Sequence, residues 1–167
     1  MIKIIARSIL IITIASGSLI ACGGSGDATP TSLAEKIAQT IEKNSYTTVE
    51  CAEIDMDPPG YLKGNKESGV CDDFIIVTYD PEVNTEWTDD FTDFVNAQGS
   101  FFCSLSSRSL ILSAWSESKN FGIYADINLG NSTEISLLNT FRQIARDAGA
   151  EKALYVKCSD GEGQRIF

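Results

Sequence analysis

The sequence predicts an α+β fold: a single layered domain with a mostly antiparallel sheet, about three helices and two disulfides. Three observations lead to this prediction. Apolar residues recur at helical spacing in three separate segments of the 167-residue chain. Apolar runs of strand length, bounded by turn residues, lie between these segments. Four cysteines follow the N-terminal region, and an even number of cysteines is typical of a disulfide framework: Cys51, Cys71, Cys103 and Cys158.

The first predicted helix covers residues 33–43. Ser32 and Glu35 have the spacing of a capping box, and the apolar residues after them repeat every three or four positions. A strand is expected over 46–54, where apolar and polar residues partly alternate. The stretch 55–69 is rich in proline and glycine, so we expect a loop there.

The middle of the chain predicts a buried strand followed by a helix. Residues 74–79 form a continuous apolar run, which is typical of a central strand covered on both faces. After Pro81, aromatic residues lie at helical spacing from Trp87 onward. The helix is expected to end near Gly99.

The last part of the chain predicts four strands and a third helix. Three strands connected by hairpins are expected first, at 101–106, 110–116 and 121–129. Asn131 is expected to cap the next helix, with Glu134 at its third position and Gly149 at its end. A final strand over 153–158 and a polar tail complete the prediction.

The expected order is therefore helix, two strands, helix, three strands, helix, strand. This order is similar to that of roadblock and longin-type domains. The resemblance concerns the order of elements alone, with no shared residue motif, so it implies a shape and no function.

The N-terminus has the layout of a secretory signal. Lys3 and Arg7 precede an apolar run that ends at Ala21, and this run is shorter than the ~20 residues that a membrane-spanning helix needs. The segment resembles a bacterial lipoprotein signal peptide, and residues 19–22 (Leu-Ile-Ala-Cys) resemble its lipobox. The resemblance implies cleavage before Cys22, a lipid on its sulfur and an acyl group on its new amino terminus.

This resemblance divides the chain into three parts: a signal peptide over 1–21, a lipidated Cys22 with a flexible tether over 22–31, and one domain over 32–167. In the enteric lipoproteins that the segment resembles, Gly23 rather than aspartate after the lipidated cysteine favours the outer membrane. We therefore expect a lipid-anchored protein of the cell envelope, facing the periplasm at the outer membrane.

The charge of the chain limits its partners. Removing the signal peptide removes two positive charges, so the formal charge falls from −10 to −12. Nucleic acid is excluded because its binding needs clustered lysine and arginine. An anionic membrane surface repels such a chain, so the membrane contact is expected to come from the lipid at Cys22. A protein partner in the envelope remains the expected partner.

The four later cysteines are expected to form disulfides rather than a zinc site, since no C-x-x-C pair is present. Cys51 and Cys71 flank the turn-rich stretch as cross-strand partners in a wide hairpin would. Cys103 and Cys158 both lie in expected strands on one face of the sheet. The expected pairs are thus Cys51–Cys71 and Cys103–Cys158.

The residues do not indicate an enzyme. The chain has no histidine, which excludes Ser-His-Asp and Cys-His catalysis and imidazole metal sites. Two adjacent acid pairs, Asp72-Asp73 and Asp89-Asp90, offer carboxylates for glycoside hydrolysis, but neighbouring residues point in different directions on a strand or helix. The acid-rich segments do not match an EF-hand loop. No cofactor and no metal ion is expected.

One face of the expected sheet mixes serine with aromatic residues. Its aromatic members are the expected contact residues for a partner: Phe102, Trp115, Tyr124 and Tyr155. The alternative is that the helix around Phe91 covers this face.

Three functions are consistent with these observations. The first is a non-catalytic binding or assembly module of the envelope. The second is an inhibitor or immunity-type protein whose acidic surface neutralises a basic enzyme. The third is a carboxylate-based hydrolase.

Overall fold

The computed structural model describes residues 32–45, 51, 65–129, 133–160 and 163–167. This part of the chain forms three helices and a six-stranded antiparallel sheet, and it contains two disulfides. The predicted α+β class is therefore confirmed. The predicted signal peptide, Cys22 and the tether lie outside the described residues.

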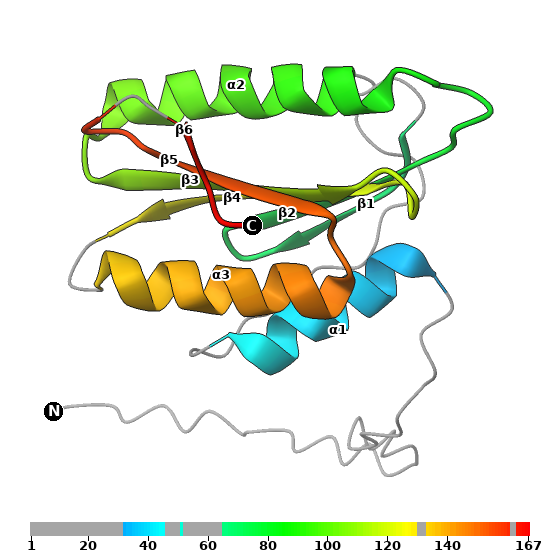
Figure 1. Ribbon diagram of the computed structural model, residues 1–167, viewed down its shortest axis with the longest axis horizontal. Coiled ribbons are helices and arrows are strands. Elements are labelled where there is room, and N and C mark those ends of the chain that lie inside the picture. The colour runs from blue at the N-terminus through cyan, green and yellow to red at the C-terminus, as the bar shows by residue number, and fades with distance from the viewer. Residues whose placement is uncertain (1–31, 46–50, 52–64, 130–132, 161–162) are drawn as a thin grey trace, which may run out of the picture.

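The molecule has three layers (Figure 1). Helix α2 covers one face of the sheet, and helices α1 and α3 lie side by side on the other face. The strand order in the sheet is β1-β2-β4-β3-β5-β6. In chain order the elements are α1 Leu33–Asn44, β1 Asn65–Cys71, β2 Phe74–Tyr79, α2 Trp87–Leu105, β3 Ser109–Ser116, β4 Phe121–Asn128, α3 Glu134–Ala148, β5 Lys152–Lys157 and β6 Gly163–Arg165.

Helices α1 and α3 begin or end as their sequence signals predict. The Ser32 hydroxyl accepts a hydrogen bond from the Glu35 amide at 3.1 Å, and the Glu35 carboxylate accepts one from the Ser32 amide at 3.0 Å. Gly149 ends α3 in the left-handed conformation, with φ 81°, which glycine adopts without a steric penalty. The core between these helices and the sheet is largely aliphatic, with Phe74, Phe121 and Phe141 among it.

The core under α2 is largely aromatic. Its buried members are Val77, Tyr79, Trp87, Phe91, Phe94, Ile111 and Tyr124. The Phe91 ring lies directly over the backbone of Gly122, where a Cβ would come within 2.5 Å of the ring. Glycine in β4 therefore makes the space that this ring fills.

The strand predicted over 101–106 is wrong, because these residues are helical to Leu105 and α2 continues through Gly99. Alternating apolar residues and an assumed stop at Gly99 produced the error. Gly99 is buried against Ile111 of β3, so it lets the helix lie close to the sheet rather than ending it. The element order that supported the roadblock and longin resemblance is therefore not that of the structure, where two strands lie between α2 and α3 and two follow α3.

Three other predictions need correction, and a fourth falls almost entirely outside the described residues. The described part of the predicted loop, from residue 65, belongs to β1, which forms a hairpin with β2 through the two-residue turn Asp72-Asp73. The polar tail includes a short strand, β6. Thr133, without a side-chain hydrogen bond, occupies the cap position of α3, and Asn131 lies outside the described residues. The strand predicted over 46–54 also lies outside them, apart from Cys51.

Both predicted disulfides are confirmed. Cys51 and Cys71 also form an antiparallel bridge between their backbones, as the hairpin reasoning expected. The reasoning for Cys103–Cys158 was wrong, because Cys103 lies on α2 and not on a strand. This disulfide joins the C-terminal end of α2 to the residue that follows β5, and so it links a helix to the sheet.

Candidate binding surfaces

Two of the four predicted contact residues, Trp115 and Tyr124, lie beneath α2 instead of on a free face, and a third, Phe102, lies on α2 itself. Tyr124 is 1% exposed, and Phe102 and Trp115 pack at the edge of the aromatic core. Helix α2, which includes Phe91, covers this side of the sheet, so the structure supports the alternative stated above. Tyr124 contacts the ring of Phe94 edge-on at 5.4 Å. The predicted contact face is therefore core.

Tyr155 lies on the opposite face of the sheet from the other three residues. In the register of β3 and β5 it pairs with Leu112, a core residue beneath α1 and α3. Directly paired residues share a face of a sheet, so Tyr155 points away from α2. The sequence placed it with Trp115 because the register between these strands could not be read from the pattern.

The outward surface at the C-terminal end of α2 is the most apolar surface of the helix. Phe101 and Leu105 are 57% and 66% exposed, and they lie four residues apart, so they are neighbours on the helix surface. Phe102 borders them, and its ring meets that of Phe101 edge-on at 5.4 Å. We call these three residues the α2 patch. The sequence prediction included Phe102 but left out Phe101 and Leu105, because it placed these residues in a strand.

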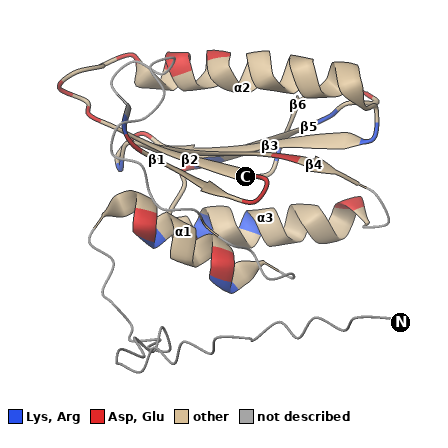
Figure 2. Ribbon diagram, turned by 180° about the vertical axis from the view of Figure 1, so that it is seen from behind, with Lys and Arg blue, Asp and Glu red and all other residues tan. Residues whose placement is uncertain are grey.

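The α2 patch belongs to an uncharged stretch of the chain. Residues 94–107 contain no lysine, arginine, aspartate or glutamate. Figure 2 shows acidic residues at the start of α2 and none over the rest of the helix. The disulfide at Cys103 joins this end of the helix to the sheet, so the patch has a fixed position.

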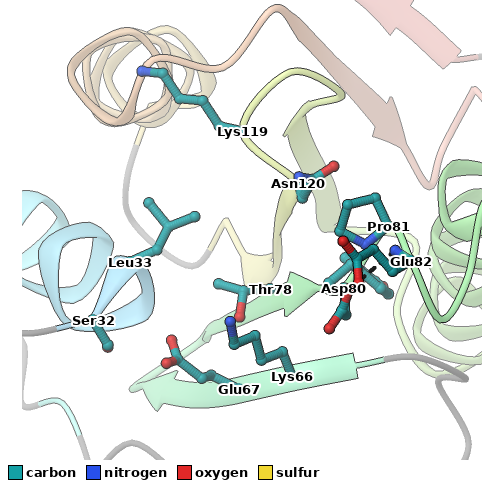
Figure 3. Close-up of a pocket in the computed structure, with 11 residues that line it drawn as sticks. Ser32, Leu33, Lys66, Glu67, Thr78, Asp80, Pro81, Glu82, Lys119 and Asn120 are labelled. Carbon is teal, nitrogen blue, oxygen red and sulfur yellow. Dashed lines mark hydrogen bonds between the residues drawn. The ribbon is translucent and has the colours of Figure 1, made fainter.

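A pocket of about 560 Å³ lies at one end of the sheet (Figure 3). It is lined by the start of α1, by β1, by the end of β2 with the segment that follows it, and by the turn between β3 and β4. Glu67 of β1 is 6% exposed, and its carboxylate accepts a hydrogen bond from the Ala34 amide of α1 at 3.3 Å. Thr78 of β2, its partner in the strand register, is 3% exposed.

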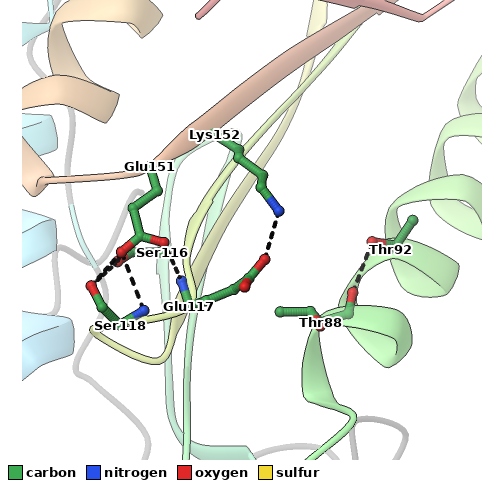
Figure 4. A network of polar contacts seen from close by, with 7 residues as sticks. All are labelled: Thr88, Thr92, Ser116, Glu117, Ser118, Glu151 and Lys152. Carbon is green, nitrogen blue, oxygen red and sulfur yellow. Dashed lines mark hydrogen bonds and ion pairs between the residues drawn. The ribbon is translucent and has the colours of Figure 1, made fainter.

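A polar network holds the turn between β3 and β4 (Figure 4). The Glu151 carboxylate accepts hydrogen bonds from the hydroxyls of Ser116 and Ser118 and from the amides of Glu117 and Ser118. The hydrogen bond from the Ser118 hydroxyl is the main cause that lowers the pKa of Glu151, and the other bonds add to it. Because this turn continues into Lys119 and Asn120, the network fixes one wall of the pocket.

A pair of acids lies at the opposite end of the sheet. Asp73 is the second residue of the β1–β2 turn, and the pairing of the next residue, Phe74, with Ala125 places Asp73 beside Asp126 of β4. Burial and the charge of Asp72 raise the pKa of Asp73, and burial and the charge of Asp73 raise the pKa of Asp126. A glycosidase needs one carboxyl group protonated and the other ionised. Both pKa values rise here, so this pair does not show that division of roles.

Comparisons with protein-family models, with curated proteins and with solved structures found no match to this chain. Within the described residues, no group of three or more cysteine, aspartate or glutamate side chains is arranged to hold a metal ion. No helix in that part of the chain combines the length and the apolar character that crossing a bilayer requires.

Proposed function

We propose that this protein is a lipid-anchored lipoprotein of the bacterial cell envelope that acts as a non-catalytic binding or assembly module. Its contact surface is the α2 patch, and its partner is a protein with an uncharged, apolar surface. The observation that carries the proposal is the exposure of Phe101 and Leu105 on an uncharged stretch of an otherwise acidic chain.

The physical argument starts from the formal net charge of the chain without its proposed signal peptide, which is −12. Such a charge keeps a protein soluble and repels most acidic partners. An uncharged apolar surface loses little hydration energy when a partner covers it, and aromatic side chains supply much of the energy at interfaces. Burying the side chains of Phe101 and Leu105 against a partner contributes about 3–6 kcal/mol before the cost of association.

Two features support the proposed location. The N-terminal segment resembles a lipoprotein signal peptide, and Gly23 after the proposed lipidation site favours the outer membrane. The two disulfides suit an oxidising compartment such as the periplasm.

Replacing Cys22 by serine tests the anchor. We expect this variant to lose labelling by a clickable fatty acid and to accumulate as the longer precursor. Equal labelling of the variant and the wild type would refute the lipoprotein assignment.

Site-specific crosslinking tests the contact surface. A photoreactive benzoyl-phenylalanine at Phe101 should give a discrete crosslinked product in intact cells. The same residue at Val83, which is 72% exposed outside the patch, is the matched control and should not. Equal products from both positions, or none from Phe101, would contradict the proposed surface.

Salt separates this function from the inhibitor alternative. An apolar contact persists when the salt concentration rises to about 1 M, whereas neutralisation of a basic enzyme weakens because salt screens exposed charges. We expect the crosslink at Phe101 to survive high salt in isolated envelopes. A product that disappears would favour the inhibitor.

A further inference from the structure

We propose that the pocket at the end of the sheet binds the primary ammonium group of a small polar molecule, with Glu67 and Thr78 as its main partners. This inference is independent of the proposed function, because the pocket and the α2 patch share no residue.

Glu67 supplies the charge that such a ligand needs. Its side chain is 6% exposed, yet its carboxylate has one hydrogen bond, from the Ala34 amide, among the described residues. A buried carboxylate normally has a cation or several donors beside it, because burial removes the water that would otherwise solvate it. Within the described part of the chain no ion pair joins Glu67 to a lysine or arginine.

The two lysines that line the pocket do not fill this role. The Lys119 ammonium lies against Gly149 at the C-terminal end of α3, where the carbonyl groups of the helix attract it. Lys66 lies at the bulge of β1, and Figure 3 shows its side chain on the pocket side, toward Thr78. It is exposed, and within the described residues no ion pair joins its ammonium group to Glu67. The charge of Glu67 is therefore available to a ligand.

Thr78 is a second, independent sign of a missing partner. Its hydroxyl is buried and has no hydrogen-bond partner among the described residues. Leaving a buried hydroxyl unpaired costs about 1–3 kcal/mol, so folded proteins usually avoid it. Figure 3 shows Thr78 and Glu67 next to each other at the floor of the pocket, where one donor group could reach both side chains.

The rest of the lining favours an amine over other ligands. Asp80 and Glu82 add two carboxylates on the far side of the pocket from α1, so the lining holds three acids against two lysines. A metal ion is disfavoured because the described residues contain no cluster of three acids arranged to hold one. An ammonium group donates up to three hydrogen bonds, and Glu67, Thr78 and Asp80 are acceptors of the right kind.

The test uses the full chain purified in detergent and two probes of similar size, putrescine and succinate, titrated by calorimetry. Putrescine should bind with one site, and succinate should not. Glu67→Gln should lower the affinity for putrescine about tenfold or more, since it removes a charged acceptor. Glu42→Gln, which removes the same charge from an exposed position on α1, is the matched control and should leave the affinity unchanged.

Thr78→Val provides a second variant that keeps the shape of the side chain. It should weaken putrescine binding about threefold to tenfold without lowering the melting temperature, because the lost hydroxyl has no partner within the described residues. Equal binding of succinate, displacement of putrescine by calcium at equal concentration, or equal affinities of the Glu67→Gln and Glu42→Gln variants would each overturn the proposal.

Discussion

The two faces of the sheet are covered in different ways. Two helices, α1 and α3, cover one face, and the core there consists mostly of aliphatic and alanine side chains. A single helix covers the other face, and aromatic residues make up five of the seven buried members of that core. One helix is narrower than the sheet it covers, so large rings fill the width that a second helix fills on the other side.

This difference affects how each layer is held. Helices α1 and α3 pack against each other as well as against the sheet. Helix α2 has no neighbouring helix in the described structure, so its attachment depends on a few rings, on the space above Gly122 and on the Cys103–Cys158 disulfide. We therefore expect α2 to be the layer that opens most easily.

The largest expected effect comes from removing a ring beneath α2. Phe91→Ala should lower the free energy of unfolding by about 3–5 kcal/mol, because it leaves a large cavity between α2 and Gly122. Phe141→Ala on the other face should cost a similar amount. The two variants should differ in hydrogen exchange: Phe91→Ala should speed exchange in α2 alone, and Phe141→Ala should not. Equal exchange in all three helices would contradict the comparison.

The two disulfides should differ in how much they stabilise the protein and in which part of the structure each one holds. The chain-entropy relation gives about 4 kcal/mol for the bridge that closes 55 residues and about 3 kcal/mol for the one that closes 20. Replacing both members of a pair by alanine, followed by urea unfolding, measures each value. Hydrogen exchange locates the effect: only the Cys103–Cys158 variant should lose protection from exchange at the C-terminal end of α2. Loss there in the Cys51–Cys71 variant would contradict this account.

A smaller effect is expected from filling the space above β4. Gly122→Ala places a methyl group within 2.5 Å of the Phe91 ring, and such overpacking costs about 1–3 kcal/mol. Gly163→Ala is the matched control, since its added carbon lies 3.7 Å from the Val156 side chain, an ordinary contact distance. Urea unfolding of both variants checks the difference, and a neutral Gly122→Ala would show that α2 has room to move.

The smallest effect concerns the paired acids at the end of the sheet. The pKa of Asp126 is raised in the folded state, so this group binds protons more tightly there than in the unfolded chain. The free energy of unfolding therefore falls as the pH rises from the ordinary pKa of 3.8 through the raised value. Asp126→Asn removes this fall and should stabilise the protein at pH 7 by roughly 0.5 kcal/mol or less.

Unfolding in urea at pH 4 and pH 7 tests this prediction. The gain in stability should be larger at pH 7. The exposed Asp93 of α2 supplies the control variant, Asp93→Asn, which removes one carboxylate outside the acid pair. A loss of stability in the Asp126→Asn variant at pH 7 would contradict the argument.

The sequence predicted the elements whose local signals agree with their tertiary contacts. The capping box of α1, the apolar run of β2 and the glycine at the end of α3 each correspond to the observed structure. It failed at residues 101–106, where alternation suited a strand while Gly99, Phe102 and Cys103 also fit one helix face. Packing of Gly99 against Ile111 decides between these patterns, and local sequence does not contain that contact.

The candidate sites were harder to predict than the fold. Glu67 lies on β1 and Thr78 on β2, and only the pairing of these two strands brings the side chains together. The sequence prediction expected most of β1 to be a loop. The α2 patch depends on the helix assignment that failed. The one available signal was the lack of charge over residues 94–107, which is unusual in so acidic a chain.

The disulfides pair in the order in which their cysteines occur along the chain: Cys51 with Cys71, then Cys103 with Cys158. If the chain is exported amino terminus first and the proposed lipid occupies Cys22, each native partner is the next cysteine to emerge after an unpaired one. An oxidase that joins successive cysteines during export would form both native bonds directly. Maturation would then need no disulfide isomerase, even though the second bond connects a helix to a distant strand.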